Sequence, residues 1–492
     1  MIPGSWRRWF AFDSLSWTAP LLIAAVLAAS MALASAPNAH PDEVDHAHAA
    51  DYYRTNWLPP KFGDAAAAAS YSKYGVSYLY STELVYLLAG KWSVLVAPLV
   101  GDINLAYRLF NLALLVAIAI AFVRKPEARP LIVPLALSAQ LWYVFSYFNG
   151  DAFAFAVALF TTYQITARAS AFNAALDAGA RIGWVKGVIA LGFGLGLLLL
   201  AKRNYDVFIA FLLGYVALRE VGLRAALAVA FGTALGVVWY YRAPAAVPVW
   251  LLAGAALAAG VVVILDVRPR LSDAAFRRRM AAFIAAAAVA LALFLPRVAF
   301  DALIVGPSAN ERSNTAGMAE AVAADGFKPS QIAANSAMWG LRMRDRGTPY
   351  LKMLLAAPHW PWLTFKSTVG AYGYMNVFGA DELYAATAAV YLALLALLGY
   401  ASRGPQNSRA RHSLIIAGVY AALLVLVSSL NSWTVDYQAQ GRYLFPVFVM
   451  LGTVFADTRG RLPVALGAAA ALAFVLAVYS FCDVGFALMV GI

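Results

Sequence analysis

The chain has 492 residues, of which 63% are hydrophobic and only 13% are charged, whereas soluble proteins carry about 25% charged residues. This composition excludes an ordinary soluble protein and predicts that most of the chain is embedded in a membrane. We expect the net charge of +12 to mark cytoplasmic loop ends, and we expect no nucleic-acid partner. The single cysteine, Cys482, excludes an intramolecular disulfide.

About 13 apolar runs are long enough, or nearly so, to cross a bilayer. The first run is too long for the apolar part of a signal peptide and is interpreted as a retained helix. Two other runs, 79–100 and 352–383, contain polar interruptions and are expected to lie along the membrane surface or to re-enter it. The chain is therefore predicted to be an all-α polytopic membrane protein, with spans near 17–36, 104–123, 131–148, 152–167, 187–201, 205–218, 225–241, 246–265, 280–299, 384–402, 413–430, 443–457 and 463–480.

The basic residues alternate between the predicted loops. With the N-terminus in the cytoplasm, every inner loop contains Arg or Lys, as at Arg124, Arg181, Arg277 and Arg409. This is the positive-inside pattern of membrane proteins. The short outer loops contain only Lys202, Arg203, Arg242 and Arg442.

The loops divide the chain into three predicted parts. Residues 1–300 form an N-terminal transmembrane module that includes a long outer loop, 37–103. Residues 301–383 form a second outer-face loop, and residues 384–492 form the C-terminal transmembrane helices. Both long loops are expected to carry amphipathic helices, and the sequence has no repeat of fixed period.

Residues 40–48, HPDEVDHAH, place three carboxylates and three histidines just after the first apolar run. Pro41 is predicted to open a helix, with Asp42 and Glu43 in its first turn. One interpretation is that these acids only complement the helix dipole, which contributes about 0.3–1 kcal/mol each. The other is that Asp42, Glu43 and Asp45 repel one another, which raises the pKa of one of them and makes it a general base.

A metal site at this segment is an alternative. His46 and His48 are two residues apart and point to different faces of a helix, and the His-Glu-x-x-His spacing of zinc sites is absent. A hard divalent cation held by Asp42, Glu43 and Asp151 is a second alternative. We predict that no cofactor is required.

Cations and aromatic residues also gather on the predicted outer face. They either reach to the membrane interface or form an anion pocket with a wall on which a sugar or lipid packs. The NGD sequence at 149–151 either turns the chain or contributes to the same site. The residues are Lys202, Arg203, Lys366, Arg442, Asn149, Asp151, Tyr372 and Tyr443.

The order of one span, an acidic Asp-Glu motif and then an aromatic helix resembles the C fold of glycosyltransferases (GT-C). DEVDHAHAADYY resembles the Asp-Glu-Val-His region of protein O-mannosyltransferases. FKSTVGAYGYMNV and YQAQGRYLFP are closer to an uncharacterised bacterial multi-span family with Pro-Asp-Glu and Gln-Gly-Arg-Tyr signatures. The chain departs from the mannosyltransferases by having Asp45 before His46, and it has no recognisable soluble sugar-binding module in its second loop.

The resemblance implies an inverting glycosyltransferase of the bacterial inner membrane, with its active site facing the periplasm or outside. The donor would be a polyprenyl-phosphate-linked sugar, and the acceptor a hydroxyl of a glycan, lipid or protein. Asp42 or Glu43 would be the base. Arg442, Lys202, Arg203 and Lys366 would hold the phosphate, and the sugar or acceptor contacts would be Asp45, His46, Asn149, Asp151, Tyr372, Tyr443 and Gln440.

The main alternative is a transporter or flippase of lipid-linked glycans, which would also need cations and aromatic residues. Such a protein is expected to have repeated halves or broken helices near the membrane midplane. A structural or assembly subunit is the third hypothesis.

Overall fold

The computed structural model describes residues 11–490 except 13, 62, 179–180, 242–248, 306–316, 318, 333–334, 336–337, 357 and 459–463. Arg242 lies outside the described residues. The described part is helical, and its only strand-like pairings are isolated bridges such as Tyr71–Ser77. The prediction of an all-α chain is therefore confirmed for these residues.

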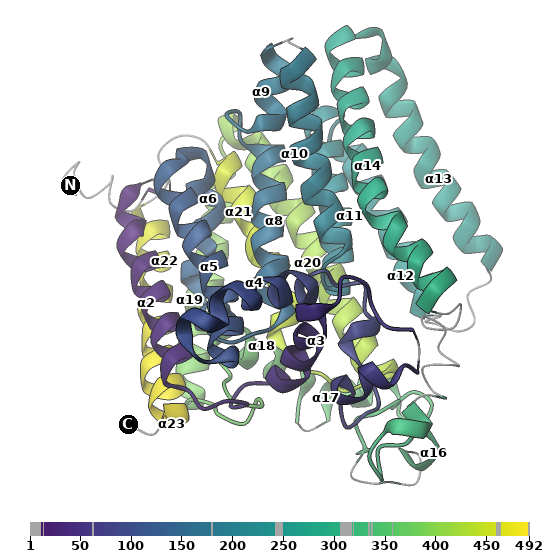
Figure 1. Cartoon of the computed structure of the whole chain (residues 1–492). Coiled ribbons are helices and arrows are strands. Elements are labelled where there is room, and N and C mark those ends of the chain that lie inside the picture. The colour runs from purple at the N-terminus through teal and green to yellow at the C-terminus, as the bar shows by residue number, and fades with distance from the viewer. Residues whose placement is uncertain are drawn as a thin grey trace.

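Nine helices in the described residues are long and apolar enough to cross a membrane. Together they identify the chain as a membrane-embedded, polytopic protein. Figure 1 shows most of them side by side in one bundle. Their bounds are Leu15–Ala34, Ile103–Arg124, Ile182–Leu199, Leu223–Tyr241, Trp250–Ser272, Ala274–Ile304, Asp381–Ala401, Pro405–Thr434 and Val464–Val490.

The long helices are built from α2 (Thr18–Ala34), α5 (Ile103–Arg124), α10 (Arg181–Leu199), α12 (Leu223–Tyr241), α13 (Val249–Val267), α14 (Ala274–Phe300), α19 (Asp381–Ala401), α20 (Ser408–Thr434), α22 (Val464–Tyr479) and α23 (Ala487–Val490). The shorter ones are α3 (Glu43–Thr55), α4 (Val85–Val100), α9 (Ala171–Ala178), α16 (Pro329–Ile332), α17 (Tyr350–Leu355) and α18 (Trp360–Val369).

The four remaining predicted spans form helices that are short or broken. Three of them are α8 (Gly150–Thr166), α11 (Asp206–Glu220) and α21 (Pro446–Asp457), which stand within the bundle in Figure 1. The fourth consists of two helical stretches, Pro126–Leu137 and Ala139–Ser146 (α7), that meet at 92°. Three prolines in the first stretch remove backbone donors and favour short helical pieces. The count of 13 crossings therefore stays a prediction.

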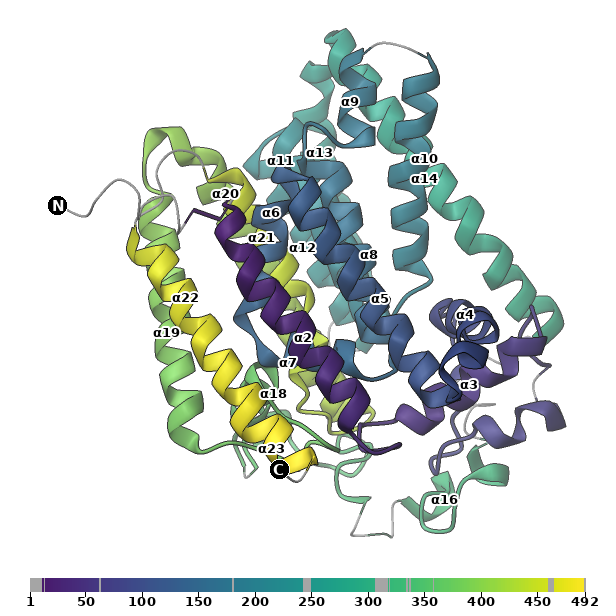
Figure 2. The same ribbon diagram turned by 60° about the vertical axis from the view of Figure 1, so that its left-hand side comes forward.

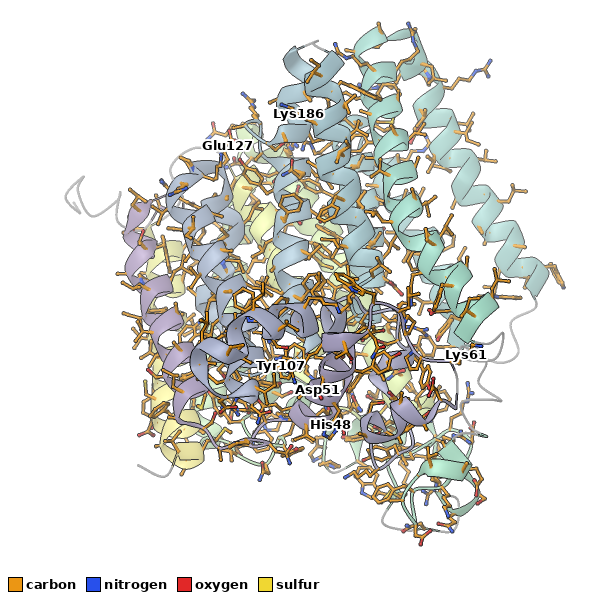
Figure 3. The ribbon with its side chains drawn as sticks, in the orientation of Figure 1. His48, Asp51, Lys61, Tyr107, Glu127 and Lys186 are labelled. Carbon is orange, nitrogen blue, oxygen red and sulfur yellow. The ribbon has the colours of Figure 1, made fainter. Side chains whose placement is uncertain are left out.

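Ion pairs join helix ends that the charge pattern places in the cytoplasm. Arg279 pairs with Glu220 (3.4 Å), and Arg409 pairs with Asp457 (3.0 Å). Figure 3 shows Glu127 and Lys186 toward one end of the bundle and His48 and Asp51 toward the other. The two predicted faces are thus separate ends of the molecule.

Helix α4 lies across the end of the bundle that contains α3. Figures 1 and 2 show it at a steep angle to the long helices, and it is seen nearly end-on in Figure 2. Leu95 and Leu99 are 72% and 83% exposed, while Tyr86 and Ala89 face the interior. A helix with one exposed apolar face and one face packed on the protein is what we expect of a segment lying along a membrane surface.

Candidate functional site

Helix α3 begins at Glu43, two residues later than the predicted start at Pro41. Asp42 is not in the first turn but occupies the N-cap position, with a left-handed backbone at φ 57° and no capping hydrogen bond from its side chain, and the prediction that Pro41 opens the helix was wrong. The reason lies just upstream, where the buried His40 ring is held between the hydroxyls of Ser35 and Tyr143 at 2.8 Å each. The chain must turn sharply after His40, and Asp tolerates the left-handed conformation better than most residues.

Asp42 contacts Arg442 across 400 residues of sequence. Its Oδ2 lies 3.3 Å from Nη2 of Arg442. The Asp42 side chain is 41% exposed, whereas that of Arg442 is 7% exposed. The carboxylate is therefore open to an approaching molecule while the guanidinium beneath it is shielded from water.

Arg442 reaches this position because Gly441 lets the backbone pass close to α18. A Cβ at Gly441 would lie 2.2 Å from the backbone nitrogen of Thr368. The Gly441 N–H donates to Oγ of Ser367 at 2.6 Å, which fixes the turn. The Gly-Arg pair of the QGRY sequence is thus a packing glycine followed by a buried cation.

The NGD sequence supplies a second anchored carboxylate. Asn149 caps α8, because its Oδ1 accepts from the N–H of Asp151 at 2.8 Å. Gly150 leaves room for Glu83, whose Oε2 would lie 2.6 Å from a Cβ at that position. Asp151 is fully buried, and its Oδ2 lies 2.8 Å from Nζ of Lys202 and 4.0 Å from Nη1 of Arg442. Asn149 is therefore a structural cap, while Asp151 links two of the predicted cations.

Asp42, Asp151, Lys202 and Arg442 will be called the Arg442 cluster. It contains two cations and two carboxylates, and burial raises the pKa of the neighbouring Glu83. Nε and Nη1 of Arg442 are buried without a hydrogen bond of good geometry among the described residues, although the phenol groups of Tyr147 and Tyr443 interact with the guanidinium and Nη1 lies 4.0 Å from Oδ2 of Asp151. Oδ1 of Asp151 is also buried, and none of the residues that the structure describes forms a hydrogen bond with it. Unsatisfied buried polar atoms are costly, and they suggest a site made to receive a ligand.

Three other predicted contact residues border the cluster. Gln440 has a buried Oε1 without a hydrogen-bond partner among the described residues, and the Tyr443 ring lies against the Arg442 guanidinium. His46 is fully buried one helical turn after Asp42. Burial lowers its pKa well below the usual value, and the Lys202 and Arg442 charges add to this effect, so the imidazole is neutral.

Asp45 is half-buried and close enough to Asp42 for the two charges to interact. Burial raises its pKa, and the Asp42 charge adds to the shift. The expected repulsion within the acidic motif therefore acts on Asp45.

Glu43, the second candidate base, is held elsewhere. Its two carboxylate oxygens accept from Nε and Nη2 of Arg108 at 2.7 and 2.8 Å. Arg108 also donates to the backbone carbonyls of Ala32, Ser35 and Ala36. Both partners are buried, so this bidentate pair locks the start of α3 to α5 and the end of α2. The contacts of Glu43 are those of a structural residue.

Three further candidates also have contacts outside the Arg442 cluster. The ammonium of Lys366 pairs with Asp381 and lies over the rings of Trp362, Phe378 and Tyr384. Tyr372 is fully buried, with its hydroxyl 3.0 Å from Oγ of Ser480. Arg203 is exposed on the turn before α11. The structure does not bring these three to Arg442.

Sequence reasoning missed several residues at this end of the molecule. Arg108 lies within a predicted span, where a charged side chain is itself a signal of function or pairing. Tyr78, Glu83 and Tyr147 border the cluster. Nothing in their sequence context distinguishes these residues from an interfacial aromatic belt or a solvated acid.

A metal site was the remaining alternative. Among the residues that the structure describes, no group of three or more His, Cys, Asp or Glu side chains is arranged to hold a metal ion. Of the three carboxylates proposed for a cation, Glu43 is paired with Arg108, and Asp151 with Lys202. The cation at Asp42, Glu43 and Asp151 stays an untested prediction.

The chain matches no protein-family model, no curated protein sequence and no solved structure.

Proposed function

We propose that the chain is an inverting membrane glycosyltransferase with a GT-C-like fold and about 13 spans. It would transfer a sugar from a polyprenyl-phosphate donor to an acceptor hydroxyl on the outer face of the bacterial inner membrane. The observation that carries the proposal is the buried Arg442 guanidinium, two of whose nitrogens make no hydrogen bond of good geometry among the described residues, 3.3 Å from a half-exposed carboxylate. The proposal takes the guanidinium as the anion-binding group and the adjacent carboxylate as the general base.

The proposed chemistry uses the different exposure of these two groups. Asp42 takes the proton from the acceptor hydroxyl as its oxygen attacks the anomeric carbon. The bond from that carbon to the phosphate oxygen breaks, and polyprenyl phosphate leaves with the electron pair. Arg442 and Lys202 stabilise the charge on the leaving phosphate, and the single displacement inverts the anomeric centre.

The mechanism assigns separate roles to the other cluster residues. Asp151 is buried and bonded to Lys202 at 2.8 Å, so it positions the cations and is not the base. The Tyr443 ring beside Arg442 offers a surface against which a sugar ring packs. Of the two predicted catalytic residues, Asp42 and Glu43, only Asp42 is exposed beside Arg442.

The anion site is tested by measuring binding of polyprenyl-phosphate sugars to the purified chain in lipid nanodiscs. Arg442→Ala is expected to weaken binding by about 2–5 kcal/mol, the cost of removing one partner of a buried charge contact. Arg442→Lys is expected to restore only part of it, because lysine cannot make the planar paired contact with phosphate. The matched control is Arg203→Ala, which removes an exposed cation next to the cluster. Unchanged affinity in folded Arg442→Ala would place the phosphate site elsewhere.

One observation favours the second candidate, a transporter or flippase of lipid-linked glycans. The 92° break at Ser138, between Pro126–Leu137 and α7, is the kind of interrupted helix that transporters use at their binding sites. Asp42→Asn separates the two functions. It is expected to reduce sugar transfer to a soluble acceptor by roughly 10²–10⁴, whereas a flippase would keep moving labelled lipid-linked glycan across reconstituted vesicles.

A further inference from the structure

His46 has one ring nitrogen without a hydrogen-bond partner among the described residues, and the charges of Lys202 and Arg442 act on this ring. The residue is completely buried, and its Nε2 has no hydrogen-bond partner among the described residues. The ring stacks on Tyr78 at 4.2 Å between centroids, and the ring of Phe148 meets it edge-on. Since a buried imidazole nitrogen without a partner is costly, Nε2 is a candidate ligand contact.

The hydrogen bonds behind the ring determine which nitrogen carries the proton. Oη of Tyr86 lies 2.9 Å from Nδ1 of His46, and the same hydroxyl donates to Oε2 of Glu83 at 3.4 Å. A phenol has one proton, and only the hydroxyl can donate in the contact between Tyr86 and an ionised Glu83. With the proton directed at that carboxylate, the Tyr86 oxygen accepts from His46 and the imidazole proton is on Nδ1, which is the tautomer that the proposal below requires.

Nε2 is then an acceptor with a free lone pair. Protonation of Nε2 would place a third positive charge beside Lys202 and Arg442, whose charges act on this ring. An acceptor can bind only a group that carries a hydrogen-bond donor. A phosphate oxygen or an ether oxygen does not satisfy it, whereas a sugar hydroxyl does.

We propose that Nε2 of His46 accepts a hydrogen bond from one hydroxyl of the transferred sugar, with Tyr86 and Glu83 fixing the required tautomer. This inference rests on the proposed glycosyltransferase function and names the part of the substrate that His46 binds, a hydroxyl of the sugar. His46 lies one turn from Asp42, whose carbonyl accepts the His46 N–H at 2.9 Å. The hydroxyl contact and the base are therefore close in sequence, and both interact with Arg442.

The tautomer is tested without any substrate. Nitrogen-15 NMR of the full-length chain labelled at histidine, in nanodiscs at neutral pH, reports which ring nitrogen is protonated. The chain has five histidines, so the His46 signals are assigned by their loss in His46→Gln. A neutral ring with the proton on Nδ1, and loss of that preference in Tyr86→Phe, support the proposal. A proton on Nε2 in the native chain overturns it.

The hydroxyl contact is tested with polyprenyl-phosphate hexoses in which each hydroxyl is replaced in turn by hydrogen. One replacement is expected to reduce transfer by the native chain on the order of 10- to 100-fold. The same replacement should have no further effect in His46→Phe, while His46→Gln, which keeps an acceptor near Nε2, should recover part of the loss. The matched control is His48→Phe, on the exposed side of α3, which should respond like the native chain.

The failure modes differ. Suppose that the native chain transfers sugar, and that each hydroxyl replacement lowers the transfer rate of His46→Phe by the same factor as that of the native chain. The His46 inference is then overturned and the proposed function stands. If the native chain transfers no sugar from any hexose donor, the proposed function is overturned, and the hydroxyl contact with it.

Discussion

Asp42 and Glu43 are neighbours in sequence, and the structure predicts opposite consequences for removing their charges. The perturbation is the conversion of each carboxylate to its amide, Asp42→Asn and Glu43→Gln. Asp42 is the partly exposed member of the Arg442 cluster, whereas Glu43 is buried against Arg108. We expect Asp42→Asn to affect turnover and Glu43→Gln to affect stability.

The size of the Glu43 effect follows from its contacts. Two charge-assisted hydrogen bonds, at 2.7 and 2.8 Å, end on its carboxylate. Gln can accept only one of them and leaves the Arg108 charge buried without a counter-ion. Breaking one side of a buried ion pair costs about 3–5 kcal/mol. The carbonyls of Ala32, Ser35 and Ala36 still accept from Arg108, so we expect the lower part of this range.

The assay is thermal unfolding of the purified chain in detergent, combined with sugar transfer at a temperature where all variants are folded. Glu43→Gln should melt at a lower temperature than the native chain. The double variant Glu43→Leu/Arg108→Met should recover part of the loss, because replacing both charges removes the unpaired one. Asp42→Asn should melt like the native chain and bind donor, yet lose roughly 10²–10⁴ in turnover.

Two results would refute this reasoning. An unchanged melting temperature in Glu43→Gln would mean that the Arg108 pair does not stabilise the fold. Near-normal transfer by Asp42→Asn, with loss of transfer in folded Glu43→Gln, would exchange the two roles and make Glu43 the base.

Three further outcomes are expected. A maleimide reagent that cannot cross membranes should label His48→Cys in a Cys482→Ser background from outside intact cells; labelling only after lysis would contradict the orientation. Chelation with EDTA should leave transfer unchanged, because the carboxylates of Glu43 and Asp151 are already paired with Arg108 and Lys202. Burial raises the pKa of Asp45, so its ionised form destabilises the fold above that pKa; Asp45→Asn should therefore raise the melting temperature at pH 7 and lose this advantage in acid.

Much of the candidate site could be predicted because the alternation of membrane spans brings its residues to one face of the molecule. The acidic motif, NGD, Lys202 and QGRY each stand at an end of an apolar segment. Alternating spans bring every second end to the same face. The structure joins them by contacts of 2.8 Å for Lys202–Asp151 and 3.3 Å for Arg442–Asp42.

The pairing within that face could not be predicted in the same way. Periodicity does not reveal that Arg108, inside an apolar run, would pair with Glu43 and leave Asp42 for Arg442. Lys366 looked equivalent to Arg442 as an outer-face cation, yet a nearby Asp381 and three aromatic rings hold it. Such choices depend on which side of a helix each residue faces, and a shift of one residue rotates a side chain by about 100°.

The left-handed backbone at Asp42 connects these observations. In a regular first turn, Asp42 and Glu43 would point about 100° apart from one continuous helix. Because α3 instead starts at Glu43, the Glu43–Arg108 pair fixes the first helical residue, and Asp42 is left on the turn above it, free to face Arg442. A strained non-glycine residue is maintained only where its surroundings fix it. Here the buried His40 on one side and the Glu43 ion pair on the other do so. Glu43 thereby contributes to the proposed chemistry by holding the neighbouring carboxylate in place.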